Sequence, residues 1–313
     1  MIRIGFFGTP ILARDVLLDL LSASDMEVVC VVTNPDKPWG RDQMMRSTPV
    51  HELAKERNIP VLTPTKIREN TDFFDTLRSF EFDYFIVVAY GRILPMELLE
   101  IPKKKSINIH GSILPKYRWA SPIQSALLHG EKQTGVTIME MSEGMDEGDI
   151  LKIRIIPIDS QETSETLFEK FSKISGPTLI QTLRELETGG ITPLLQNHTE
   201  ASYCKKITKE EGLIDWSKSA EEIYHMWQAF TPWPGIYTMY EGKRLLLESV
   251  ASISRERREW EKYGTVIQLD HGIIGIICSE WILTLDQVKL EWKKSQSIKD
   301  FANGHKEFIR SIL

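Results

Sequence analysis

Short apolar runs alternate with amphipathic stretches through the first half of the chain. Four runs have the length and near-continuous hydrophobicity of buried strands: residues 2–7, 28–32, 84–89 and 106–109. Between the first two, residues 13–22 place valine and leucine at helical spacing. Strands that are apolar on both faces and separated by helices are typical of a parallel sheet covered on both sides. The pattern therefore predicts a doubly wound α/β domain.

Two longer strands and a helical region follow. Residues 135–141 and 149–158 are predicted to pair as a hairpin across an acidic, glycine-containing turn. Apolar residues at helical spacing then continue as far as the glycines at 189 and 190, which end the pattern. We expect the first domain to cover residues 1–190. Residues 191–206 are polar and show little periodicity, so they are predicted to be a linker.

The remaining chain, residues 207–313, has the pattern of a small β-rich domain. One short amphipathic helix is predicted at residues 220–230. Strand-like runs broken by turn residues follow at 235–240, 244–250, 265–269, 273–278 and 281–285. Several short strands at nearly regular spacing indicate a small β-barrel.

Composition and charge restrict the class of protein. With 313 residues, 42% of them hydrophobic, the chain can bury sizeable cores, yet no apolar run approaches the roughly 20 residues that cross a bilayer. A strand predicted at residue 2 leaves no space for a secretory signal, so we expect a cytoplasmic protein with no membrane partner. Three widely separated cysteines argue against disulfides and against a zinc site. The net charge of −6 gives no overall basic character for nucleic-acid binding.

Three polar residues form a candidate catalytic group. Asn108 and His110 stand two apart near the end of a predicted strand, so their side chains share one side of it. Ligands of open parallel sheets bind at the carboxyl ends of the strands. An amide and an imidazole there can hold an oxyanion and move a proton. Asp146, in the turn of the predicted hairpin, is placed to orient the imidazole.

Simpler interpretations of these residues remain open on spacing alone. Polar residues at strand ends are usually hydrogen-bonded boundary residues, and an acidic turn is usually a solvated loop. The turn around Asp146 does not have calcium-loop spacing, and no metal is expected. Spacing therefore nominates the three residues without assigning their chemistry.

The motifs around these residues resemble the formyltransferases that use 10-formyltetrahydrofolate, and the resemblance spans nearly the whole chain. The segments that carry it are Phe7-Gly8-Thr9-Pro10, Val87-Val88-Ala89-Tyr90-Gly91, Ile107-Asn108-Ile109-His110-Gly111-Ser112-Ile113-Leu114-Pro115 and Gly144-Met145-Asp146-Glu147-Gly148-Asp149. Ile214-Asp215-Trp216-Ser217 and Pro232-Trp233-Pro234-Gly235 are similar to the C-terminal part of the members that act on tRNA. The resemblance implies a Rossmann-like catalytic domain followed by a smaller, OB-like barrel.

The resemblance also implies a mechanism and a donor site. Asn108, His110 and Asp146 match the family's catalytic positions, where an amine attacks the formyl carbon directly and the tetrahedral oxyanion is stabilised by the amide and a protonated imidazole. The folate pocket of the family is lined by two loops. Their residues in this chain are Ser112, Ile113, Leu114 and Pro115, and Gly91, Arg92, Ile93 and Leu94.

The acceptor implied by the resemblance is the methionyl group of an initiator tRNA. Residues 33–50 form a polar loop with several basic residues, and by similarity this loop enters the acceptor stem of the tRNA, with Arg41 in contact. A flexible surface loop is the alternative interpretation of that segment. The expected enzyme is a monomer of domains 1–190 and 207–313, the second one binding tRNA.

Departures from the family pattern keep two other functions open. Trp119 stands where a glycine is usual, Gln228 replaces a usual arginine, and Trp292 replaces a glycine beside two lysines. Acidic residues also slightly outnumber basic ones beyond residue 208. The first alternative is a formyltransferase acting on a small amine such as an amino sugar nucleotide. The second is a non-catalytic RNA-binding protein, against which the intact Asn108, His110 and Asp146 argue.

Overall fold

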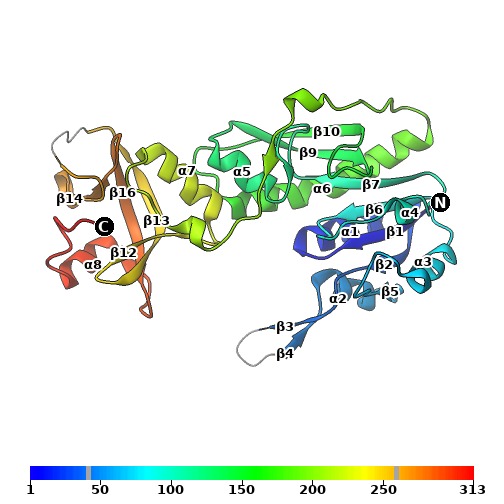
Figure 1. Cartoon of the computed structure of the whole chain (residues 1–313), viewed down its shortest axis with the longest axis horizontal. Coiled ribbons are helices and arrows are strands. Elements are labelled where there is room, and N and C mark those ends of the chain that lie inside the picture. Colours follow the sequence, from blue (N-terminus) through cyan, green and yellow to red (C-terminus); the bar gives the residue numbers. More distant parts are fainter. Residues whose placement is uncertain (40–43, 257–260) are drawn as a thin grey trace. The chain divides into compact units, whose positions relative to one another are not determined.

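The computed structural model describes residues 1–39, 44–256 and 261–313, and the chain divides into two compact units (Figure 1). Unit 1 comprises Met1–Pro122, Gln133–Pro157 and Phe168–Cys204, and unit 2 comprises Ile123–Lys132, Ile158–Leu167 and Lys205–Leu313. Two short segments of the first half thus group with the C-terminal residues, and a division at residues 190 and 206 stays a prediction. Nowhere in the described parts of the chain does a helix have the length and apolar character of a membrane span.

Unit 1 is built on a seven-stranded sheet with the strand order β10, β9, β7, β6, β1, β2, β5. Its parallel strands are β1 (Ile2–Gly8), β2 (Met26–Val32), β5 (Val61–Leu62), β6 (Tyr84–Val88) and β7 (Lys105–His110). The antiparallel pair β9 (Gln133–Glu140) and β10 (Ile150–Pro157) extends the sheet beyond β7. The predicted parallel strands and hairpin are confirmed. The two-residue β5 is too short to show a periodicity, and the sequence pattern does not predict it.

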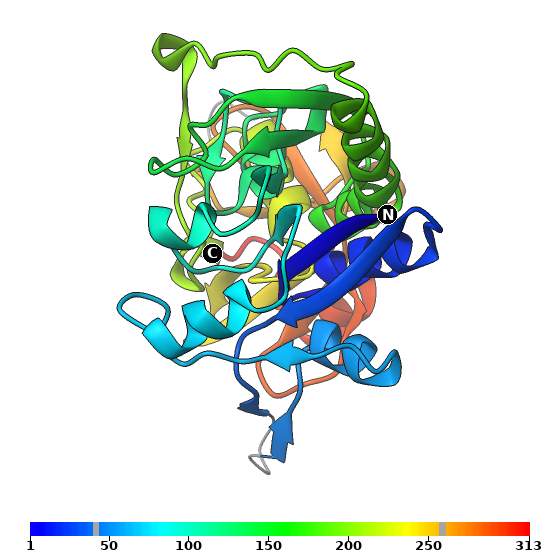
Figure 2. The same cartoon turned by 90° about the vertical axis from the view of Figure 1, so that its right-hand side faces the viewer.

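Helices cover both faces of this sheet because its central strands are buried on both sides. The helices of the first 190 residues are α1 (Ile11–Ser22), α2 (Pro49–Glu56), α3 (Thr71–Arg78), α4 (Met96–Leu99), α5 (Pro122–Leu128) and α6 (Ser164–Glu187). Of these, α5 after its first residue and the first turn of α6 group with unit 2. Phe7 and Phe85 of the sheet pack with Phe74 of α3 and Leu98 of α4 in one apolar cluster. Figure 2 shows α1 and α6 along the opposite face. The doubly wound arrangement predicted from the sequence is confirmed.

Unit 2 is an antiparallel sheet accompanied by short helices. Its elements are α7 (Ala220–Phe230), β12 (Ile236–Tyr240), β13 (Lys243–Ser254), β14 (Val266–Gln268), β15 (Ile274–Ile277), β16 (Ile282–Leu290), β17 (Gln296–Ser297) and α8 (Ile298–Gly304). The strand order is β12, β13, β16, β15, β14, with β17 paired to β16. Three register shifts between β13 and β16 are β-bulge positions, which increase the local twist of a strand pair. The predicted small domain of antiparallel strands is confirmed.

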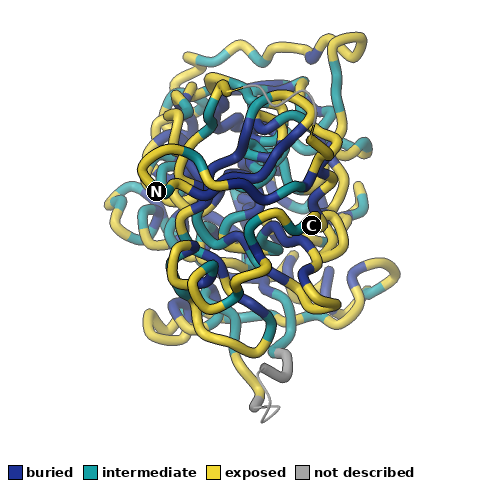
Figure 3. Tube along the Cα trace, turned by 90° about the vertical axis from the view of Figure 1, so that its left-hand side faces the viewer, coloured by how far each residue is buried: buried dark blue, intermediate teal, exposed yellow. Residues whose placement is uncertain are grey.

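Burial follows these elements closely (Figure 3). Buried positions concentrate in the strands, whereas loops are mostly exposed.

α7 begins at a capping box in which Ser219 accepts from the backbone N–H of Glu222, while the Glu222 carboxylate accepts from the backbone N–H of Ser219. The residue at which this helix starts is therefore determined by the local sequence.

Gly130, just after α5, packs directly against the ring of His225 on α7. Its φ is +63°, and a β-carbon at this position would collide with the His225 ring. Gly130→Ala should therefore lower the free energy of unfolding by about 2 kcal/mol or more, because backbone strain and overpacking add. Urea unfolding measures the loss. Gly242→Ala is the control, since Gly242 has φ +73° with nothing within 4 Å of a β-carbon; equal losses in the two variants would contradict the collision.

Candidate active site

Asn108 and His110 lie at the carboxyl end of β7, between β6 and β9. Asn108 is level with Val87 on β6 and with Met139 on β9, so pairing on both sides fixes its height in the sheet. The two side chains leave the strand on the same side, as their spacing predicts. His110 is buried, and Asn108 is partly buried. The imidazole is therefore largely shielded from solvent while the amide stays within reach of a ligand.

Asp146, in the loop between β9 and β10, turns its carboxylate toward these two side chains. Its Oδ1 accepts a long hydrogen bond of 3.4 Å from Nδ2 of Asn108. Its Oδ2 lies 3.6 Å from Nδ1 of His110. The structure thus brings together the amide, the imidazole and the carboxylate that the sequence nominates.

The two ring nitrogens of His110 have different neighbours. Nε2 lies 2.8 Å from the backbone oxygen of Tyr117, which can only accept, so Nε2 carries a hydrogen. Nδ1 faces the Asp146 carboxylate across a gap longer than a hydrogen bond. In the imidazolium form both nitrogens donate, which suits both neighbours. Nδ1 is the nitrogen that can reach a substrate group placed between His110 and Asp146.

The loop that carries Asp146 is held in place by Gln196. The amide Nε2 of Gln196 donates to the backbone oxygens of Asp146 at 2.9 Å and Gly148 at 2.7 Å. Asp146 itself has φ +58°, a left-handed conformation that non-glycine residues adopt at a cost. The two hydrogen bonds from the Gln196 amide, one on each side of Glu147, therefore fix the backbone turn that points the Asp146 carboxylate toward β7. Gln196 falls in the predicted linker, where lack of periodicity gave no signal of its role.

Arg118 is a fully buried cation behind this turn. Its Nε and Nη2 donate to Oε1 of Gln196 at 3.2 and 2.8 Å. Nη2 also lies 3.2 Å from Nδ1 of His198. Nη1 forms an ion pair with Glu147, 3.3 Å from its Oε1. A buried charge is tolerated only when it is paired and hydrogen-bonded. Arg118 therefore orients Gln196, which in turn orients Asp146. An arginine in a segment without apolar periodicity is normally predicted to be exposed. For this reason the sequence did not indicate the role of Arg118.

The loop Ser112–Pro115 following β7 is held by several hydrogen bonds and is partly buried. Thr137 Oγ1 donates to the backbone oxygen of Ser112 at 2.6 Å and accepts from the backbone N–H of Leu114 at 3.3 Å. The Ser112 hydroxyl donates to the backbone oxygen of Lys116. Ser112 and Leu114 are buried, whereas Ile113 and Pro115 are partly exposed. Of the four predicted donor-site residues, Ile113 and Pro115 therefore offer side-chain surface, whereas Ser112 and Leu114 hold the loop shape.

The loop Gly91–Leu94 following β6 ends at the same edge of the sheet as the previous one, because β6 and β7 are parallel neighbours. Arg92 donates to Oδ1 of Asn34 at 2.6 Å and to the backbone oxygens of Pro64 and Thr65. Its guanidinium thus braces neighbouring loops, while Ile93 is exposed and Leu94 is buried. Whether these four residues contact the donor stays a prediction.

Tyr90, the residue before this loop, is buried beneath it. Burial raises the pKa of Tyr90 to about 12, so the hydroxyl stays protonated. That hydroxyl has no hydrogen-bond partner within the described residues. Asn34 donates to the backbone oxygen of Tyr90 and thereby fixes the start of the loop. Asn34 was not singled out by sequence reasoning, because a lone amide after a strand carries no pattern.

Arg41 lies outside the described residues. The strands on either side of that gap, β3 (Lys37–Trp39) and β4 (Met44–Arg46), pair with each other in antiparallel fashion. A tRNA contact by Arg41 therefore stays a prediction. Over the described ranges, no group of three histidine, cysteine or acidic side chains is arranged to hold a metal ion.

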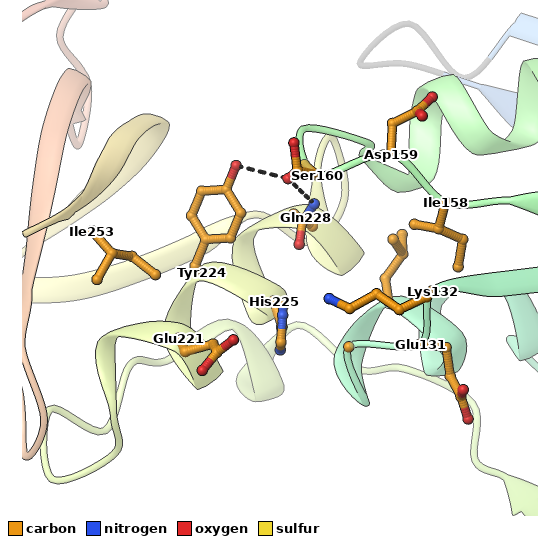
Figure 4. A pocket seen from close by; sticks show the side chains of 12 residues that line it. Glu131, Lys132, Ile158, Asp159, Ser160, Glu221, Tyr224, His225, Gln228 and Ile253 are labelled. Carbon is orange, nitrogen blue, oxygen red and sulfur yellow. Dashed lines mark hydrogen bonds between the residues drawn. The ribbon is translucent and has the colours of Figure 1, made fainter.

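A separate cavity of about 260 Å³ opens in unit 2, with α7 forming one wall (Figure 4). Gln228 is one of the residues that line it, and its Nε2 donates to the backbone oxygens of Ser160 and Glu162. Burial lowers the pKa of His225 in the same wall, and the nearby Glu221 carboxylate partly opposes that shift. None of the candidate catalytic residues lines this cavity. Gln228, a departure from the family pattern, therefore has a structural role in tying α7 to residues 160–162.

Comparison with known proteins places the chain in a family. Residues 2–183 match the family described as Formyl transferase, and residues 206–306 match Formyl transferase, C-terminal domain. The chain belongs to the formyl transferase family. The expected fold class and the expectation of an enzyme that transfers formyl groups are confirmed.

Within that family, several similar proteins are named methionyl-tRNA formyltransferase. The methionyl-tRNA formyltransferase of Caldicellulosiruptor saccharolyticus is 39% identical over 303 residues, covering 97% of each chain. The methionyl-tRNA formyltransferase of Pseudoalteromonas translucida is also 39% identical, over 98% of this chain and 95% of its own. The similarity at this level of identity extends over both parts of the chain, including the region beyond residue 206.

Solved structures of the same fold include formyltransferases with different names. An N-formyltransferase from Helicobacter canadensis, in complex with folinic acid and dTDP-3-aminofucose, superposes with a TM-score of 0.67 at 19% identity, covering 92% of this chain and 100% of its own. A methionyl-tRNA formyltransferase from Clostridium thermocellum gives a TM-score of 0.57 at 20% identity, covering 80% of this chain and 94% of its own. At such low identity these likenesses show the fold alone.

Proposed function

We propose that this chain transfers the formyl group of 10-formyltetrahydrofolate to the α-amino group of methionine on initiator methionyl-tRNA. The observation that carries the proposal is the convergence of Asn108, His110 and Asp146 at the end of β7 in a chain that is 39% identical to methionyl-tRNA formyltransferases over nearly its full length. We further propose that the enzyme is a monomer and acts in the cytoplasm. Light scattering of the purified protein measures its oligomeric state.

The proposed chemistry is acyl transfer by direct attack of the amine. The acceptor nitrogen forms a bond to the formyl carbon and gives up a proton, while the bond from that carbon to the folate N10 breaks and N10 takes a proton. Asn108 Nδ2 and His110 Nδ1 supply two hydrogen-bond donors for the oxyanion of the tetrahedral intermediate. Asp146, whose carboxylate lies 3.6 Å from Nδ1 of His110, is proposed to orient the imidazole for this role.

Preorganisation is the second contribution of the protein. Gln196 and Arg118 hold the Asp146 turn before any ligand arrives, so no backbone rearrangement is required at the moment of reaction. Burial of the His110 ring raises the strength of its interaction with the carboxylate, because water is excluded. The three groups need only align the amine and the formyl carbon, which is itself a large part of catalysis.

The donor is proposed to bind along the loops after β6 and β7. Ile93, Ile113 and Pro115 provide partly exposed apolar surface there, which suits the flat ring system of a folate. The brace from Arg92 to Asn34 keeps the first of these loops in place. For the acceptor, we propose that Arg41 contacts the tRNA and that residues 207–313 form its second binding domain, joined by residues 191–206.

An acceptor competition tests the proposal. Charged initiator tRNA, uncharged tRNA, free methionine and an amino sugar nucleotide are each offered with 10-formyltetrahydrofolate, and formylated product is measured by mass spectrometry. We expect product from the charged tRNA alone, because the proposed acceptor site spans both the amine and the nucleic acid. Formylation of the amino sugar nucleotide without tRNA would establish the small-amine alternative instead. Failure with active donor and every acceptor would favour a non-catalytic protein.

A further inference from the structure

An aromatic pair lies directly beside the candidate catalytic carboxylate. The rings of Trp119 and Tyr203 have centroids 4.6 Å apart and planes tilted by 44°. The backbone N–H of Trp119 donates to Oδ2 of Asp146 at 2.8 Å. Trp119 is nevertheless 46% exposed and Tyr203 50% exposed. Two large rings that stay half exposed next to a reacting group offer a surface to a flat ligand.

The backbone holds Trp119 in a conformation that bulky residues rarely adopt. Its φ is +80°, which costs about 1–3 kcal/mol for a residue other than glycine. The parallel pairing of β8 (Arg118–Trp119) with β11 (Tyr203–Cys204) fixes the segment, as does the bond to Asp146. Strained residues of this kind cluster at ligand-binding and active sites. The indole is therefore positioned by the fold, where a glycine would satisfy the backbone more easily.

We propose that Trp119 and Tyr203 form a stacking surface for the terminal purine base of the aminoacylated acceptor. The inference rests on the proposed function and extends it. In an aminoacyl nucleotide only an ester and a ribose separate the reacting amine from the base. With the amine held at Asn108 and His110, the base lies within one nucleoside of Asp146, beside the aromatic pair. Unpaired bases at RNA ends are recognised by stacking on aromatic side chains.

The competing occupant of this surface is the ring system of the folate donor. The loops that fit the donor follow β6 and β7 of the large sheet, whereas the aromatic pair belongs to the separate two-stranded β8–β11 sheet. The backbone N–H of Trp119 also donates to the carboxylate of Asp146, which faces His110. The placement therefore favours the acceptor as the ligand of the pair.

A binding experiment without turnover tests the stacking surface. One RNA hairpin ends in an unpaired adenosine, and a matched hairpin carries an abasic terminal nucleotide. The wild-type enzyme should bind the adenosine-ended hairpin more tightly, on the order of tenfold, as expected for one stacked base. Trp119→Gly should abolish that preference, Tyr203→Ala should reduce it, and Trp119→Phe, which keeps a ring, should retain most of it.

The matched control is Trp292→Gly in unit 2. Trp292 also has a positive φ, +65°, and is 86% exposed, so the substitution is the same in residue type and backbone conformation. It should leave the ratio of the two hairpin affinities unchanged, whatever its effect on each of them. Far-ultraviolet circular dichroism of each variant checks that it is folded, and the phenylalanine variant keeps the test decisive should the glycine variant unfold.

Steady-state kinetics separates this inference from the proposed function. Trp119→Gly should raise KM for charged tRNA about tenfold and leave KM for the folate donor unchanged. A rise in the donor KM with the base preference intact would assign the pair to the donor and overturn the inference. Equal affinity of the wild-type enzyme for the two hairpins would also overturn it. Absence of turnover with charged tRNA in the wild type would instead overturn the proposed function.

Discussion

Replacing Asn108 by alanine should lower kcat by about a hundredfold or more, because one of the two proposed oxyanion donors is lost. In the structure, the Asn108 side chain makes a long hydrogen bond of 3.4 Å to Asp146, so its removal should cost the resting protein little stability. The KM for the folate donor should therefore change much less than kcat. Initial rates at saturating donor and charged tRNA measure the effect.

Two further variants show whether the Asn108 effect is chemical. Asn303→Ala changes the same residue type at an exposed position of α8 and should leave kcat at the wild-type value. The unfolding midpoint of Asn108→Ala should stay close to that of the wild type. A wild-type kcat in Asn108→Ala would disprove the assigned role, and a large fall in its unfolding midpoint would point to a structural one.

Arg118→Met should be the most destabilising single change considered for this protein. The fully buried guanidinium is bound to Gln196, His198 and Glu147, and removal of one partner from a buried charged network costs about 3–5 kcal/mol. Activity should fall together with stability, because Gln196 then loses the group that orients it toward Asp146. Urea unfolding and kcat are measured on the same preparation.

The geometry of the guanidinium, as well as its charge, matters at this position. Arg118→Lys keeps the charge but cannot donate through Nε and Nη2 to one oxygen, so it should recover only part of the loss. Arg184→Met removes an exposed ion pair with Asp25 and serves as the control, with a much smaller effect. Similar losses in the Arg118→Met and Arg184→Met variants would refute the buried network as a source of stability.

Much of the fold was predictable because its signals are local and repeated. The strands that end in Val32 and Val88 are largely apolar on both faces, and that pattern is typical of strands inside a parallel sheet. Asn108 and His110 were found because the two-residue repeat of a strand puts them on one side. Asp146 was found in a turn rich in glycine and acidic residues, and the family resemblance joined it to the other two.

The residues that support the site were not predictable in the same way. Arg118 and Gln196 are 78 positions apart and act through hydrogen bonds that leave no periodic trace. Tyr203 lies in a segment whose polar composition indicates a linker, and its contact with Trp119 depends on a two-residue strand pairing. Long-range polar contacts of this kind depend on tertiary packing, which neither propensity nor hydrophobic pattern encodes.

The hydrogen bonds from Gln196 to the Asp146 turn set a limit on how this protein can be dissected. A fragment that stops at residue 190 would keep every strand of the large sheet and all three candidate catalytic residues. It would lack the amide that fixes the turn and the strand that pairs with Trp119. The smallest piece that retains the active-site geometry therefore runs through Cys204, beyond the last element of the sheet and its covering helices.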